Sequence, residues 1–181
     1  MEMPADSNES RLARLLSQCT VELLSELGVQ PELVSGMPHA PSAGECVAAF
    51  SGFGNDQIRG SFTFLGPGKL FSRLHPLPSG VTPRDLTDWA CELVNQSVGR
   101  FRNRLLAYGV KLALSVPQSA LAESLRLASS LQPARSPIAF AIDGMVLEGW
   151  LELKIEPAFR LAERPLANGQ EALKEGSVVL F

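Results

Sequence analysis

The stretch TPRDLTDWACELVNQSVGRFRNRLLAYGV, residues 82–110, predicts a long amphipathic helix. Thr82 suits the N-cap, Pro83 suits the first helical position, and Asp85 completes the spacing of a capping box. Gly109 is placed to end the helix. The side chains expected on its buried side follow helical periodicity. They are Leu86, Ala90, Leu93, Val94, Ser97, Val98, Phe101 and Leu105.

The opposite side of this helix carries a narrow polar stripe. Asp88, Glu92, Asn95 and Gly99 stand at positions i, i+4, i+7 and i+11, which are stacked neighbours on one face. Ordinary amphipathicity also produces a polar face, so the pattern alone leaves a structural interpretation open. Glycine within a helix costs about 1 kcal/mol against alanine, however, and it allows another surface to approach the backbone closely. The stripe is therefore a candidate functional face.

The rest of the chain repeats a helix followed by a hairpin. Residues 8–27 have helical spacing before Gly28, and residues 45–65 read as a hairpin that turns at residues 54–56. Residues 137–155 read as a second hairpin that turns at Asp143-Gly144. Both long helices, the second reaching about Ala107, end in Gly-Val, and the two hairpins share a sequence pattern. These repeats predict an α+β fold, an α/β sandwich in which two long helices pack on a largely antiparallel sheet made of two related halves.

The remaining segments give weaker signals. Residues 29–44 read as loop, residues 69–74 as one or two helical turns, and residues 110–117 as a short strand. Residues 118–135 fit either a short helix or an edge strand. The tail after residue 155 reads as a linker with a possible final strand at residues 177–181.

The composition fits one domain with a substantial core. The chain has 181 residues, 45% of them hydrophobic, and a formal net charge of −3. That charge provides no basic footprint for nucleic acid or for a membrane surface. No apolar run approaches the roughly 20 residues of a membrane span, and the polar start MEMPADSNES differs from a signal peptide. Three widely spaced cysteines, Cys19, Cys46 and Cys91, predict free thiols in the cytoplasm.

The polar stripe resembles the motif of the CheC/CheX/FliY phosphatases of bacterial chemotaxis. That motif is Asp or Ser, three residues, Glu, two residues, Asn, twenty-one residues and Pro. Asp88, Glu92, Asn95 and Pro117 occupy it at those spacings, and Gly99, four residues after the asparagine, is similar to the CheX branch. The upstream hairpin GFGNDQIRGSFTF is also similar to that branch.

The resemblance covers about residues 8–155. It implies a CheX-like domain there, with a disordered N-terminus over residues 1–7 and a C-terminal tail or extra strand over residues 156–181. It also implies hydrolysis of the aspartyl phosphate of a CheY-type response regulator, a cytoplasmic location and a homodimer. Glu92 would pair with a regulator lysine and Asn95 would orient the attacking water, while Asp88, Gly99 and Pro117 support the site. No cofactor is expected on this chain, because the Mg²⁺ belongs to the regulator.

The first helix predicts one site per chain. Aligning Gly28 with Gly109 places Arg11 opposite Glu92 and Arg14 opposite Asn95, and Ser7 falls opposite Asp88. A second active copy, as in the CheC branch, would need glutamate and asparagine at the two arginine positions. A non-catalytic module that docks a regulator or a flagellar-switch component stays open as the alternative function.

Other residues carry weaker signals. Two histidines, His39 and His75, lie in proline-rich loops and predict no metal site. Cys91 is expected at the edge of the core, and the segment GPGKL, residues 66–70, is expected to form a turn. The tryptophans, Trp89 and Trp150, are expected in the core or an interface. Arg100, Arg102 and Arg104 form either a solvated face or a docking surface for an acidic regulator.

Overall fold

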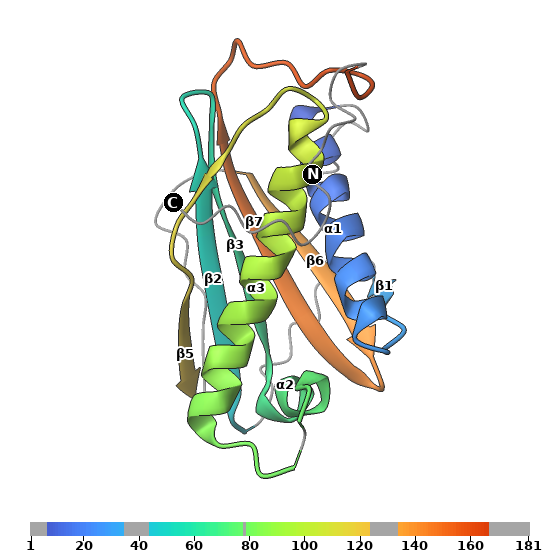
Figure 1. Cartoon of the computed structure of the whole chain (residues 1–181), viewed down its shortest axis with the longest axis vertical. Coiled ribbons are helices and arrows are strands. Elements are labelled where there is room, and N and C mark those ends of the chain that lie inside the picture. Colours follow the sequence, from blue (N-terminus) through green and yellow to red (C-terminus); the bar gives the residue numbers. More distant parts are fainter. Residues whose placement is uncertain (1–6, 35–43, 78, 124–133, 167–181) are drawn as a thin grey trace.

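The structure, a computed structural model, describes residues 7–34, 44–77, 79–123 and 134–166. It contains a seven-stranded antiparallel sheet with two long helices side by side on one face (Figure 1). The predicted α+β class and two-helix sandwich are confirmed. The helices are α1 (Asn8–Glu26), α2 (Gly68–Leu74) and α3 (Pro83–Leu106). The strands are β1 (Glu32–Val34), β2 (Cys46–Gly54), β3 (Ile58–Pro67), β4 (Ala113–Leu114), β5 (Gln118–Ala122), β6 (Ala134–Ile142) and β7 (Met145–Ile155).

Helix α3 forms where the sequence predicts it. The Thr82 hydroxyl accepts a hydrogen bond from the Asp85 backbone N–H at 3.3 Å, and the Asp85 carboxylate accepts one from the Thr82 N–H at 2.8 Å. This reciprocal pair satisfies backbone donors that the first turn leaves without helical partners. All eight residues predicted for the buried side of α3 are buried. The orientation of the polar stripe away from the core follows from that packing.

The two long helices end in the same way. Gly28 and Gly109 have φ angles of +80° and +76°, a backbone conformation that glycine adopts without strain. The N–H groups of Val29 and Val110 then donate to carbonyls five residues earlier, as in a Schellman motif. Both valines are buried. The shared ending supports the alignment of α1 with α3 on which the one-site prediction depends.

The halves of the sheet exchange their edge strands. The strand order is β1-β6-β7-β3-β2-β4, with β5 also paired to β2. Strand β1, which follows α1, therefore pairs with the second hairpin, and β4 and β5, which follow α3, pair with the first. Neither half completes its own part of the sheet.

The two hairpins meet along β3 and β7 at the centre of the sheet. Phe62 lies opposite Leu151 in this pairing, and both side chains are fully buried. Gly60 on β3 lies where a Cβ would collide with the Glu152 carbonyl oxygen of β7, so the close strand approach requires glycine. Gly149 on β7 is less crowded, but its Cβ would still lie 3.1 Å from the ring of Phe62 on β3 and from the Ile138 carbonyl oxygen of β6. The shared sequence pattern of the hairpins thus reflects close packing at the junction.

Several weaker expectations are corrected. Residues 32–34, expected in a loop, form β1, because their backbone pairs with β6 even though their side chains are exposed. The strand expected at residues 110–117 is limited to β4, and β5 begins after Pro117. Residues 118–122 take the strand alternative by pairing with β2. The expected strand at residues 177–181 and the N-terminal residues 1–6 lie outside the described residues.

The segment after β7 packs on the domain instead of leaving it as a linker. Phe159 and Leu161 are buried in the core, 3% and 5% exposed. The Asn8 side chain donates to the Phe159 carbonyl at 2.9 Å and accepts from the Leu161 N–H at 3.2 Å. Further on, the Leu166 N–H donates to the Ala107 carbonyl at 2.8 Å. The segment therefore connects the start of α1 with the end of α3.

Candidate functional site

The predicted stripe lies on the side of α3 that faces away from the sheet. Asp88 and Glu92 are exposed, while Asn95 and Gly99 are half-buried. Their neighbours on the other side of the helix, including Leu93 and Val94, are fully buried in the core. The packing of α3 thus fixes which way the stripe faces, and the side chains of the stripe are open to a partner.

The two carboxylates of the stripe are held by their own helix. Asp88 forms an ion pair with Arg84 one turn earlier, at 3.6 Å, and both side chains are mostly exposed. Such a pair contributes little to stability and is easily exchanged for another partner. The Gln96 amide donates to Glu92 Oε1 at 2.6 Å. The sequence analysis missed Gln96, although its i+4 spacing from Glu92 is a signal that could have identified it.

The amide of Asn95 has no hydrogen-bond partner within the described part of the chain. Asparagine is a poor helix former, because its amide competes for backbone groups in other conformations. Here the side chain neither caps the helix nor supports a neighbouring residue. Its carbonyl oxygen and NH₂ group are both free to bind a water molecule or a group of a docked partner.

Gly99 leaves the helix surface bare one turn beyond Asn95. A Cβ built on Gly99 would meet nothing within 4 Å. The glycine is therefore not required by packing within the described residues, unlike Gly60 at the centre of the sheet. Because Gly99 has no side chain, it leaves space on the outer surface of the helix.

Pro117 is half-buried and lies directly before β5. Strand β5 runs along β2 and contacts α3 (Figure 1). Proline has no N–H to donate, and it separates the short pairing of β4 from that of β5. The structure thus places the fourth residue of the motif at the start of an element that packs on the helix carrying the other three.

The residues of α1 that align with the stripe of α3 make contacts within the domain. Arg11, aligned with Glu92, donates hydrogen bonds to the backbone carbonyls of Leu161, at 2.8 Å, and Ala162. Ser7, aligned with Asp88, is the N-cap of α1, where its hydroxyl accepts from the Ser10 N–H at 3.2 Å. Ser7 was expected in a disordered N-terminal segment. This part of α1 therefore binds the segment after β7.

Two of the three candidate docking arginines face α1. Arg100 forms a two-pronged ion pair with Glu26, and the bond to Glu26 Oε1 measures 2.9 Å. Arg104 contacts both oxygens of Glu22, at 3.0 and 2.8 Å. Hydrogen bonding to Arg100 lowers the pKa of Glu26 below its ordinary value. These two arginines join α3 to α1, so the idea that they dock a regulator is not favoured.

Among the described residues, the thiols and the histidine form no second candidate site. Cys19 is fully buried, and burial raises its pKa to about 11, which suppresses the reactive thiolate. Cys91 is half-buried. His75 packs edge-on against Trp89, with ring centroids 5.6 Å apart. Among the described residues, no three His, Cys, Asp or Glu side chains gather as a metal site, and His39 lies outside those residues.

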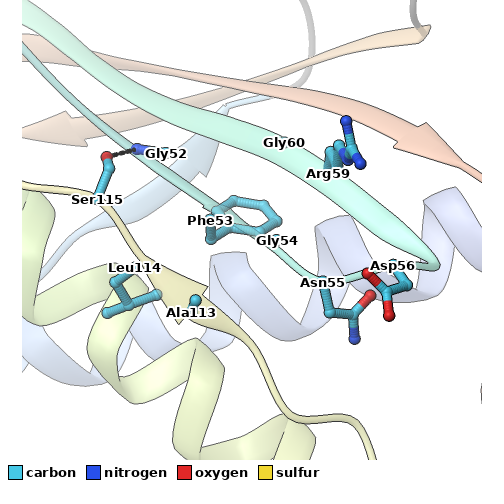
Figure 2. A pocket seen from close by; sticks show the side chains of 10 residues that line it. All are labelled: Gly52, Phe53, Gly54, Asn55, Asp56, Arg59, Gly60, Ala113, Leu114 and Ser115. Carbon is cyan, nitrogen blue, oxygen red and sulfur yellow. Dashed lines mark hydrogen bonds between the residues drawn. The ribbon is translucent and has the colours of Figure 1, made fainter.

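An open pocket of about 530 Å³ lies elsewhere, between the tip of the β2–β3 hairpin and β4 (Figure 2). Its polar groups already serve the hairpin. The Asn55 side-chain oxygen Oδ1 accepts from the N–H groups of Gln57 and Ile58 at 2.8 Å, and the Ser115 hydroxyl accepts from the Gly52 N–H at 2.8 Å. None of the predicted site residues lines this pocket.

In the described residues, no helix is both long and apolar enough to span a membrane.

By sequence, the chain matches no protein-family model and no curated protein. By structure, it is similar to the chemotaxis protein CheX from Vibrio vulnificus, with a TM-score of 0.70 at 12% identity over 82% of this chain and 100% of that one. A CheC-like protein from Shewanella gives a TM-score of 0.68 at 15% identity, over 79% and 97% of the two chains.

A third similar structure is a CheX–CheY–BeF₃–Mg²⁺ complex from Borrelia burgdorferi. It gives a TM-score of 0.64 at 17% identity, over 79% of this chain and 97% of that one. These likenesses extend over nearly the full length of each of the three neighbours. The chain therefore has the fold of the CheX and CheC-like chemotaxis proteins.

Proposed function

We propose that this chain is a CheX-like phosphatase that hydrolyses the aspartyl phosphate of a CheY-type response regulator. The observation that carries the proposal is the unengaged amide of Asn95, one turn from the exposed carboxylate of Glu92 and beside the bare backbone at Gly99. The fold supports the choice of partner, because one similar structure is a CheX bound to CheY.

Asn95 would act by positioning water. In phosphoryl transfer, the protein contributes mainly through alignment of the nucleophile and neutralisation of charge. The Asn95 amide would hold a water molecule in line with the bond between phosphorus and the aspartyl oxygen. That bond breaks as the water oxygen bonds to phosphorus, and the products are inorganic phosphate and the free aspartate. A neutral amide suits this role, because a carboxylate would add negative charge beside the phosphate.

Glu92 would orient the regulator. Its carboxylate is exposed and, among the described residues, is held only by the neutral Gln96 amide, so a lysine of the regulator can replace or join that bond. The ion pair would fix the register of the two proteins and thereby deliver Asn95 to the phosphate. The Mg²⁺ that neutralises the phosphoryl group would come with the regulator. A homodimer remains a prediction, which sedimentation of the purified chain would test.

The test is the decay of phosphorylated CheY-type regulators with and without the full chain. The wild type is expected to accelerate phosphate release, and Asn95→Ala is expected to abolish the acceleration while leaving thermal unfolding nearly unchanged. Gln18→Ala provides a matched control, because Gln18 is an exposed amide on α1. A regulator that binds the wild type without faster decay would refute the phosphatase and favour the non-catalytic docking module.

A further inference from the structure

The polar stripe of α3 continues beyond Gly99 to Arg102. This residue lies seven positions after Asn95, two helical turns further along the same face. Arg100 and Arg104 point instead toward α1, where Glu26 and Glu22 neutralise them. Three arginines at alternate positions are thus divided between two sides of one helix.

Arg102 is a cation without a carboxylate partner among the described residues. Its guanidinium contacts only the Asn103 side-chain oxygen, at 3.3 Å from Nε and 3.2 Å from Nη2. That acceptor is neutral and is the next residue in the chain. The ion pairs of Arg84, Arg100 and Arg104 show that this helix neutralises its other arginines with nearby carboxylates.

The face therefore has an ordered charge pattern along the helix axis. It begins with the carboxylates of Asp88 and Glu92, passes the neutral Asn95 and the bare Gly99, and ends with the cation of Arg102. Glu92 and Arg102 are about 15 Å apart along an ideal helix, and Asn95 and Arg102 are about 10 Å apart. In the structure the Arg102 guanidinium lies against Asn103 and not against Asn95, and it lies within the surface that a docked protein would cover.

We propose that Arg102 is a specificity-determining residue that pairs with an acidic side chain on the regulator surface. The inference rests on the proposed function for the identity of the partner. Together, Glu92 and Arg102 would form a two-point charge pattern of opposite sign on either side of Asn95. A partner with the two charges reversed would be repelled at both ends, so the pattern selects the orientation as well as the partner.

A purely structural role for Arg102 predicts a different result. A basic residue in the last turns of a helix stabilises it through the helix dipole, and that effect would appear in thermal unfolding. A docking role would appear in the affinity for the regulator and in its dependence on salt. The two roles are therefore separable in one set of variants.

The experiment measures binding of the full chain to CheY-type receiver domains loaded with beryllofluoride and Mg²⁺, so no turnover is needed. Arg102→Gln is expected to weaken binding roughly 3- to 10-fold and Arg102→Glu further, as for a charge at the rim of an interface. Arg102→Lys should retain most of the affinity. Arg104→Gln, the matched control, should lower the melting temperature and leave affinity unchanged.

The salt dependence and a charge exchange complete the test. Raising the ionic strength should weaken wild-type binding more than binding of Arg102→Gln. A regulator variant whose acidic residue is changed to lysine should restore binding to Arg102→Glu.

Equal affinity of wild type and Arg102→Glu for the regulator would overturn the inference about Arg102 while leaving the proposed phosphatase activity untested by this result. Arg102-dependent binding without turnover would refute only the phosphatase, and binding to no receiver domain would refute both.

Discussion

Arg11 on α1 donates a 2.8 Å hydrogen bond to the backbone carbonyl of Leu161, 150 positions later in the chain. The alignment of the two long helices gives Arg11 the place that Glu92 has on α3. On α3 this position is exposed, whereas on α1 it binds the segment after β7. The two halves share a backbone plan but differ in what their exposed faces contact.

Arg11→Ala is expected to lower stability without lowering phosphatase activity. The substitution leaves the carbonyls of Leu161 and Ala162 without their charged donor, at a cost of about 1–3 kcal/mol in the free energy of unfolding. Urea unfolding would measure the loss, with Gln18→Ala on the same helix as the control. Loss of phosphatase activity in a variant of unchanged stability would contradict the structural role.

Glu92→Gln is expected to raise the KM for phosphorylated regulator about tenfold, with a smaller change in kcat. The variant keeps the shape of the side chain and removes the charge that would pair with a lysine. Steady-state phosphate release would separate the two parameters. Gln96→Ala, which removes the 2.6 Å bond to Glu92, should have a smaller effect. A fall in kcat alone would instead place Glu92 in the chemical step.

Substitutions of Gly99 are expected to separate folding from docking. Gly99→Ala should stabilise the chain by about 1 kcal/mol, since its Cβ would meet open space and alanine is the better helix former. Gly99→Gln should also fold, but its longer side chain should obstruct the regulator and reduce binding more than alanine does. Thermal unfolding and binding to a beryllofluoride-loaded regulator would report both properties. Full affinity in the glutamine variant would show that nothing approaches the helix there.

The ion pair between Glu26 and Arg100 predicts a pH-dependent contribution to stability. The pKa of Glu26 is lowered from its ordinary 4.5, chiefly by the hydrogen bond from Arg100. The folded state therefore favours the charged form, so the contribution is complete above pH 4.5 and is lost as the pH falls through the lowered pKa. Because the Glu26 side chain is 56% exposed, we expect less than about 1 kcal/mol.

Glu26→Gln should therefore melt slightly below the wild type at pH 7, and the two should converge as the pH falls through the lowered pKa of Glu26. Glu156→Gln, at an exposed carboxylate in the segment after β7, is the control. A difference in melting temperature that showed no decrease with falling pH would contradict the assignment to the charged pair.

The sequence predicted the helices better than the edges of the sheet. Helix α3 was predicted with its cap and its whole buried side, because capping and periodicity are local properties of the chain. Strand β1 was missed because its side chains are exposed and only its backbone pairing with β6 makes it a strand. Asn8 and Arg11 bind carbonyl groups about 150 residues away, and no local pattern signals such a contact.

The stripe could be predicted for a related reason. Its four positions follow from the helical period, and the packing of α3 then decides that they face outward. The contacts of Arg100 and Arg104 could not be predicted in this way, because they depend on where α1 lies against α3. The sequence therefore could not divide the three arginines, whereas the structure pairs Arg100 and Arg104 with α1 and leaves Arg102 on the stripe.

The exchange of edge strands gives the domain the architecture that a fused dimer would have. A protein consisting of one half would have its helix, its hairpin and an edge strand whose partner lies in the other half. Only a second copy could complete its sheet, with the two hairpins meeting as β3 and β7 do at Phe62 and Leu151. Joining two copies into one chain frees them to diverge. In this chain one half keeps an exposed polar face on α3, while the other uses the matching face of α1 to bind the segment after β7.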